Sequence, residues 1–295
     1  MVYRKFIKGQ EILRKGNIKQ GFRSAKAATK AGRNFAQRGQ LQKALFAFTT
    51  AIVMDCYQWD AYRLRGIAYA KMGRYRLAMK NLDMAIQHIP LCAGCFFERG
   101  TVKMLSGKLE SALEDLSQCV KLEPEYAPAY SSRAAIFTRK GFYRRALKDI
   151  KTALSLHPQN INYRHNRAVI FTALGRYREA IEDYEHVIKL NPKSGGSYNN
   201  LAWLLSTVKN PAYRDCRKAI FYARKALQID KNESWMDTLA AAYAECGNFE
   251  KAVIIEEEAY KKSKPPNENF HQRIEIYKTG KTYVKWRAER NLSLQ

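Results

Sequence analysis

Six cysteines are the residues of this 295-residue sequence that most directly offer chemistry. Cys92 and Cys95 form a C-x-x-C motif, and Cys56 could approach that pair. A zinc site needs four ligands, but no second C-x-x-C motif and no paired histidines follow in the sequence. Cys119 stands at a position that small apolar residues share, which indicates the core. We therefore expect mostly reduced cysteines that serve packing, with no metal; a metal or redox site at the C-x-x-C motif is the lesser alternative.

His165 could serve as a ligand or a general base. The sequence pattern places neither a carboxylate nor a nucleophile beside it, so we interpret it as a solvated polar residue. Glycine-rich phosphate loops and the HExxH and GxSxG motifs are absent from the sequence. We expect a protein that is not an enzyme and that needs no cofactor.

A row of arginines recurs at one position, every 34 residues: Arg65, Arg99, Arg133 and Arg167. Such a row could hold phosphates or carboxylates. A second row recurs at the same interval and consists of Asn81, Asp115, Asp149 and Asp183. Because a partly buried arginine is rarely left unpaired, we favour pairing between the two rows over ligand binding.

The same 34-residue period runs through the glycines, alanines and prolines. Glycines mark it at Gly39, Gly73, Gly107, Gly141 and Gly175; Lys209 takes the place after an insertion, and Gly247 resumes it. Five residues after each of these glycines stands an alanine: Ala44, Ala78, Ala112, Ala146, Ala180 and Ala252. Prolines follow the interval at Pro90, Pro124, Pro158 and Pro192. A fixed period of this size is the signature of a stacked repeat array, which presents a long surface.

One period, residues 59–92, predicts two helices. Apolar and small residues at helical spacing predict the first, and Gly73 ends it, because glycine enters the left-handed C-cap conformation without a Cβ penalty. Ala78, Leu82 and Ala85 mark the inner face of the second helix, and Pro90 stops it. Gly66 and Ala78 are small enough to let the two helices approach closely.

This pattern resembles the tetratricopeptide repeat family over residues 25–264. The resemblance implies an all-α, right-handed superhelical solenoid of helical hairpins. We number seven repeats in chain order: 25–58, 59–92, 93–126, 127–160, 161–194, 195–232 and 233–266. Repeat one has Cys56 where proline is usual, and repeat six carries five extra residues before Ala219. Residues 1–24 form a basic N-terminal extension, and residues 267–295 are expected to form a capping helix and tail.

The resemblance also implies that the first helices of the repeats line a concave groove. Its outward positions carry Arg63, Lys71, Arg139, Asn162, His165, Asn166, Asn199, Asn200 and Trp203. Asn166 and Asn200 occupy the same position in adjacent repeats, and an amide side chain can pair with the backbone of an extended peptide. No three consecutive repeats carry the lysine, asparagine and arginine set with which some family members clamp a C-terminal carboxylate, so we do not expect that function.

The formal net charge of +25 favours acidic partners, which include acidic protein segments, nucleic acid and anionic lipid. Solubility alone is the competing explanation. The excess is greatest at the N-terminus, in a basic arm of Arg4, Lys5, Lys8, Arg14, Lys15, Lys19, Arg23, Lys26, Lys30 and Arg33. An organellar transit segment is an alternative for this arm, but it continues into repeat one without a small-residue break. No run of about 18 apolar residues predicts a membrane span, and no apolar core of a secretory signal is evident.

We expect from these features a non-catalytic, cytoplasmic scaffold or adaptor. It would bind another protein through an acidic or extended segment in the groove. The alternative is an RNA- or ribonucleoprotein-associated repeat protein that uses the basic surface. Tyrosine is abundant, with 18 residues, but most of the tyrosines occupy core repeat positions, which weakens the case for base stacking.

Overall fold

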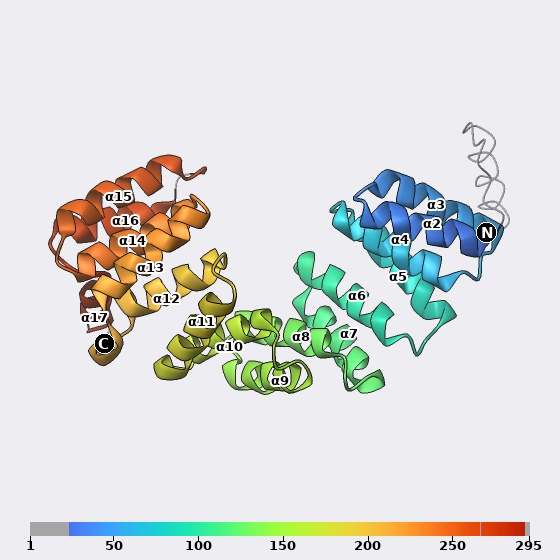
Figure 1. Ribbon diagram of the computed structural model, residues 1–295, viewed down its shortest axis with the longest axis horizontal. Coiled ribbons are helices and arrows are strands. Elements are labelled where there is room, and N and C mark those ends of the chain that lie inside the picture. Colours follow the sequence, from blue (N-terminus) through green and yellow to red (C-terminus); the bar gives the residue numbers. More distant parts are fainter. Residues whose placement is uncertain (1–23, 266, 293–295) are drawn as a thin grey trace. The chain divides into compact units, whose positions relative to one another are not determined.

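The computed structural model describes residues 24–265 and 267–292, which are helical throughout apart from turns (Figure 1). The described part of the chain divides into two compact bodies, an N-terminal body that ends at Lys140 and a C-terminal body that begins at Gly141. Each body consists of antiparallel helical hairpins, so the all-α hairpin architecture is confirmed. None of the helices in the described part of the chain is long and apolar enough to cross a membrane.

The N-terminal body contains α2 to α8. The helices are α2 (Ala25–Gln37), α3 (Leu41–Met54), α4 (Trp59–Lys71), α5 (Tyr75–His88), α6 (Ala93–Leu105), α7 (Leu109–Leu122) and α8 (Ala127–Arg139). Helices α2, α4 and α6 each pack on the helix that follows, and α3, α5 and α7 pack on the next first helix.

The C-terminal body continues the pattern and adds two helices. Its elements are α9 (Tyr143–Leu156), α10 (Ile161–Ala173), α11 (Tyr177–Leu190), α12 (Gly195–Thr207), the 3-10 turn η1 (Pro211–Tyr213), α13 (Cys216–Ile229), α14 (Glu233–Glu245), α15 (Phe249–Lys262), α16 (Glu268–Lys278) and α17 (Tyr283–Leu292). The extra residues of repeat six form η1 and its flanking turns. Helix α16 packs on α15 and buries Phe270, Ile274 and Tyr277.

The helix ends fall where the period predicts them. Six glycines, Gly39, Gly73, Gly107, Gly141, Gly175 and Gly247, adopt φ between 70° and 80°, which is the left-handed conformation that glycine tolerates best. Pro90 follows the C-cap residue Ile89 of α5 directly, and Pro124 follows Glu123 of α7 in the same way. Proline therefore prevents α5 and α7 from continuing.

Small residues set the distance between paired helices. The alanines five residues after the period glycines are fully buried at 0% exposure: Ala44, Ala78, Ala112, Ala146, Ala180 and Ala252. A Cβ atom built on Gly100 would lie 3.1 Å from Cγ of Leu116 and 3.3 Å from the carbonyl oxygen of Ala112. Helix α6 thus lies against the backbone of α7 at Gly100, which restricts how the side chains of α6 can be oriented.

Candidate functional site: the first-helix face

Three arginines of the 34-residue row hydrogen bond to side chains of their own repeats. The Arg99 guanidinium donates to Asp115 at 2.8 and 2.7 Å, and Arg167 donates to Asp183 at 2.7 and 2.8 Å. Arg65 donates to the Asn81 amide oxygen at 2.7 Å. Hydrogen bonding to Asp183 raises the pKa of Arg167 above its usual value. The predicted pairing is confirmed for these three arginines, so their guanidinium groups serve the packing of the hairpins.

The cationic groove candidates of the N-terminal body lie among carboxylates. Arg63 lies 3.3 Å from Asp60 and 3.8 Å from Glu98, and Arg33 pairs with the same Asp60. Burial raises the pKa of Glu98, while Arg63 and Lys71 oppose that shift. This part of the first-helix face therefore carries alternating charges along α2, α4 and α6, and acids of the chain already oppose Arg33 and Arg63.

The remaining basic candidates of this body are exposed. Lys26 and Lys30 lie on α2, Lys71 ends α4, and Arg139 ends α8. The arm residues Arg4, Lys5, Lys8, Arg14, Lys15, Lys19 and Arg23 lie outside the described residues.

In the C-terminal body, α10 and α12 bring His165 against Ser197. The His165 Nδ1 atom lies 2.7 Å from the Ser197 hydroxyl, which lies 2.9 Å from the Ser194 hydroxyl. The expectation that no nucleophile lies beside His165 is thus wrong, because stacking of adjacent repeats juxtaposes residues that are far apart in sequence. Ser197 is nevertheless fully buried, and burial lowers the pKa of His165, which favours the neutral imidazole at pH 7. The contact orients the imidazole and offers no exposed nucleophile.

The asparagines of the same helices differ in their surroundings. Asn162 is exposed, whereas Asn166 and Asn200 are half-buried. Asn200 and Thr172 hydrogen bond the Tyr184 hydroxyl, whose pKa burial raises to about 12. The Asn199 side-chain oxygen is buried and, within residues 24–265 and 267–292, has no hydrogen-bond partner. A buried amide oxygen without a partner carries an uncompensated desolvation cost.

Trp203 packs against residues of the last two helices, α16 and α17. The Arg273 guanidinium carbon is 5.0 Å from the Trp203 ring centre and 5.0 Å from that of Tyr283, and Arg273 also pairs with Asp237. The Trp203 and Tyr283 rings lie 5.8 Å apart. These contacts engage the indole within the chain, and the repeat pattern could not have predicted them because α16 and α17 lie beyond it.

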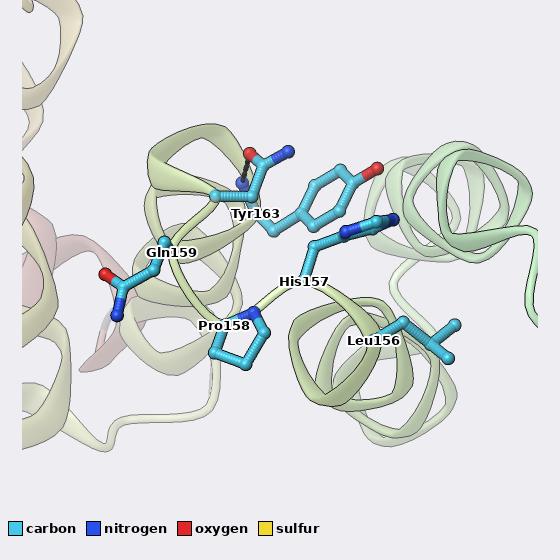
Figure 2. A pocket seen from close by; sticks show the side chains of 6 residues that line it. Leu156, His157, Pro158, Gln159 and Tyr163 are labelled. Carbon is cyan, nitrogen blue, oxygen red and sulfur yellow. Dashed lines mark hydrogen bonds between the residues drawn. The ribbon is translucent and has the colours of Figure 1, made fainter.

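A hollow of about 500 Å³ lies where the chain passes from α9 to α10. Figure 2 shows the side chains that line it. It is lined by Leu156, His157, Pro158, Gln159, Asn160 and Tyr163. The Asn160 side-chain oxygen accepts the backbone N–H groups of Asn162 and Tyr163 at 3.0 and 3.2 Å, so it caps α10. The lining includes no carboxylate and no lysine or arginine, and it offers no catalytic arrangement.

Four cysteines form two disulfides, Cys92–Cys95 and Cys216–Cys246, so the expectation of a mostly reduced chain is wrong for the structure. Cys92 caps α6 and Cys95 lies in its first turn, which brings the two sulfurs together. Cys216 begins α13 and Cys246 ends α14, and antiparallel packing places these ends side by side. Cys119 is buried as predicted, and Cys56 is exposed. No cluster of three or more potential metal ligands occurs among the described residues.

Sequence reasoning overlooked Glu256. Its position in α15 corresponds to Phe48, Leu82, Leu116, Ile150 and Tyr184 in other repeats, all of which are buried. Glu256 is fully buried too, and neither carboxylate oxygen has a hydrogen-bond partner among the described residues. Burial raises the pKa of Glu256 to about 8. The break in an otherwise apolar row was the available signal.

Comparison with known proteins supports this architecture. Residues 162–194 match the family model for the tetratricopeptide repeat. A tetratricopeptide repeat protein from Parabacteroides merdae has a similar structure, with 15% identity, a TM-score of 0.65 and coverage of 86% of this chain and 98% of that one. The comparison with curated protein sequences found no match.

Two further solved structures share the fold. The Pseudomonas aeruginosa pilF structure is 16% identical with a TM-score of 0.62, and the match covers 70% of this chain and 92% of that one. A chain of the APC/C Cut9–Hcn1 structure is 16% identical with a TM-score of 0.67, with coverage of 81% and 46%. At such identities the likeness concerns the fold alone.

Residues 162–194 therefore form a tetratricopeptide repeat, and the other helical hairpins follow its 34-residue pattern. Proteins built on this scaffold typically mediate protein–protein interactions and are usually non-catalytic.

Proposed function

We propose that this protein is a non-catalytic scaffold or adaptor that binds an extended, acidic segment of another protein on its first-helix face. The supporting observation is the set of polar, uncharged side chains that α10 and α12 present in adjacent repeats: Asn162, His165, Asn166, Asn199 and Asn200. Asparagine can donate to and accept from a peptide backbone whatever the peptide sequence. The net charge of +25 supports the acidic character of the segment.

His165 would stay neutral in the complex, because burial already lowers its pKa, and would contribute orientation more than charge.

A displayed library of acidic peptides tests the proposal. We expect selected peptides to bind the full chain and to lose at least about tenfold in affinity in the double variant Asn166→Ala/Asn200→Ala, since each lost hydrogen bond contributes about 1 kcal/mol. The matched control is Gln159→Ala/Gln228→Ala, which removes two exposed amide side chains from other positions. Equal affinity of both double variants, with unchanged melting temperatures, would place the binding site elsewhere.

The second candidate is RNA binding, and the outer surfaces of two second helices favour it. On α9, Arg144, Arg145, Lys148 and Lys151 are exposed, and the single acid of that helix, Asp149, is buried. On α13, Arg217, Lys218, Arg224 and Lys225 surround Phe221, whose exposure is 53%. Cations beside an exposed aromatic ring suit phosphates and bases. A steep salt dependence of binding to single-stranded RNA would favour this candidate over the first.

A further inference from the structure

We propose that Cys92 and Cys95 form a thiol–disulfide exchange site, in which Cys92 is the sulfur that is attacked and that carries the mixed disulfide. A cysteine pair of a bound protein is the substrate. The proposal goes beyond the scaffold function because it assigns a chemical reaction to these two cysteines. Each chain exchanges one disulfide with its partner, so the reaction requires no catalytic turnover. It depends on four features of the start of α6.

The first feature is the unequal access to the two sulfurs. Cys92 is partly exposed, whereas Cys95 has 0% exposure. An incoming thiolate can therefore reach Cys92, while Cys95 is held inside as the resolving or leaving sulfur. Exchange sites need this asymmetry, because the buried thiol must act on the mixed disulfide and not on solvent species.

The second feature is the helix terminus that supports a thiolate. Cys92 is the N-cap residue of α6, and its sulfur accepts the backbone N–H of Cys95 at 3.2 Å. The N–H groups of the first turn and the positive end of the helix dipole stabilise a thiolate at this position. Cys95, in the first turn, gains from the same dipole when it leaves as a thiolate.

The third feature is that the surface beside Cys92 leaves room for a partner chain. A Cβ atom built on Gly94, between the two cysteines, would meet nothing within 4 Å. Leu91, next to Cys92, is 77% exposed. A partner backbone can thus lie over Gly94 and contact an apolar side chain while its sulfur meets Cys92.

The fourth feature is that repeat geometry, and not chance, brings the pair together. Ser194 and Ser197 occupy the corresponding positions where repeat five meets repeat six, and their hydroxyl oxygens lie 2.9 Å apart. Alanine fills the position of Cys95 in two other repeats, as Ala61 and Ala129, both at 0% exposure. The fold therefore accepts small residues at the buried position, so a cysteine there is not required for packing.

In the exchange, a partner thiolate attacks the Cys92 sulfur, the Cys92–Cys95 bond breaks, and its electron pair leaves on Cys95 as a thiolate. The second partner thiolate then attacks the partner's own sulfur in the mixed disulfide, and Cys92 leaves as a thiolate. The partner dithiol is oxidised to a disulfide by two electrons, Cys92 and Cys95 are reduced, and the two protons of the partner thiols pass through solvent to the cysteines.

Trapping with oxidised glutathione tests the assignment on the reduced full-length chain. We expect Cys95→Ala to accumulate one glutathione on Cys92, because no thiol remains to resolve the mixed disulfide. We expect Cys92→Ser to leave Cys95 unmodified, because it is buried. Peptide mapping by mass spectrometry identifies the modified cysteine, and the exposed Cys56 reports ordinary thiol reactivity in every sample. The wild-type chain should pass through the mixed disulfide to the Cys92–Cys95 disulfide.

Three results would overturn the proposal. The first is glutathione on Cys95 of Cys92→Ser at the rate seen on Cys92 of Cys95→Ala. The second is modification of Cys56 with Cys92 left free in Cys95→Ala. The third is a wild-type pair that does not convert between dithiol and disulfide in glutathione buffers of graded ratio. Because alanine and serine occupy these positions in other repeats, both variants should fold, and circular dichroism checks that they do.

Discussion

The Asp115 carboxylate accepts hydrogen bonds from Nε and Nη2 of Arg99, at 2.8 and 2.7 Å, across the hairpin of α6 and α7. Lys103 adds a third cationic contact to the same carboxylate at 2.8 Å. The Asp115 side chain is only 4% exposed, so two cations depend on one buried acid. We therefore expect substitution of Asp115 to lower the free energy of unfolding more than substitution of any other charged residue in repeat three.

Asp115→Ala should lower the free energy of unfolding by about 3 kcal/mol, the low end for breaking a buried ion pair, because Arg99 keeps a contact with Asp83. The control is Asp83→Ala: Asp83 is 57% exposed, and a surface pair contributes about 1 kcal/mol or less. Urea unfolding followed by circular dichroism measures both. Equal midpoints for the two variants would contradict a structural role for the pair.

Gly100→Leu should destabilise the protein by about 1 to 3 kcal/mol, because the added side chain has no room. A Cβ atom alone would lie 3.1 Å from Leu116 and 3.3 Å from the Ala112 carbonyl oxygen. Gly94→Ala is the control, since its Cβ meets nothing within 4 Å, and its melting temperature should match or slightly exceed that of the wild type. Thermal melts that coincide for all three proteins would show that Gly100 is not a close-packed position.

Stability should fall as the pH rises towards about 8, because burial raises the pKa of Glu256 to about 8. The unfolded chain loses this proton near its ordinary pKa of about 4.3. Between these two values unfolding releases a proton, so the contribution of Glu256 is full at acidic pH and declines by about 1.4 kcal/mol per pH unit as the pH rises.

Glu256→Leu restores the apolar residue that other repeats carry at this position, and it should remove this component of the pH dependence. Glu250→Gln, on the exposed side of α15, is the control and should leave the pH profile unchanged. Urea midpoints at pH 5, 7 and 9 provide the comparison. A wild-type profile that rises between pH 5 and 9 in parallel with that of Glu256→Leu would mean that Glu256 ionises normally.

Deletion of residues 1–24 should reduce the salt dependence of nucleic-acid binding if the basic arm contacts phosphates. Log affinity is expected to fall with log salt by about 0.7 to 0.9 for each phosphate contacted. The repeats should remain folded, because α2 begins at Ala25. Binding to single-stranded RNA over a salt series measures the slope. An unchanged slope and affinity would leave the arm with no role beyond solubility.

The sequence alone determined the local features that recur at the 34-residue period. The period glycines, the prolines after the second helices and the buried alanines follow from backbone and steric rules that act within a few residues. The pairs Arg65–Asn81, Arg99–Asp115 and Arg167–Asp183 were also predictable, because each joins the two helices of one hairpin.

The tertiary structure decided the contacts between repeats and beyond them. His165 of repeat five contacts Ser197 of repeat six. The Trp203 ring packs against Arg273, which belongs to a helix that follows the last repeat. Cys216 joins Cys246 because antiparallel packing brings a helix start to the end of the next helix. A periodic pattern specifies which faces are buried, but the particular partner of a side chain depends on how neighbouring helices pack, and no single repeat contains that information.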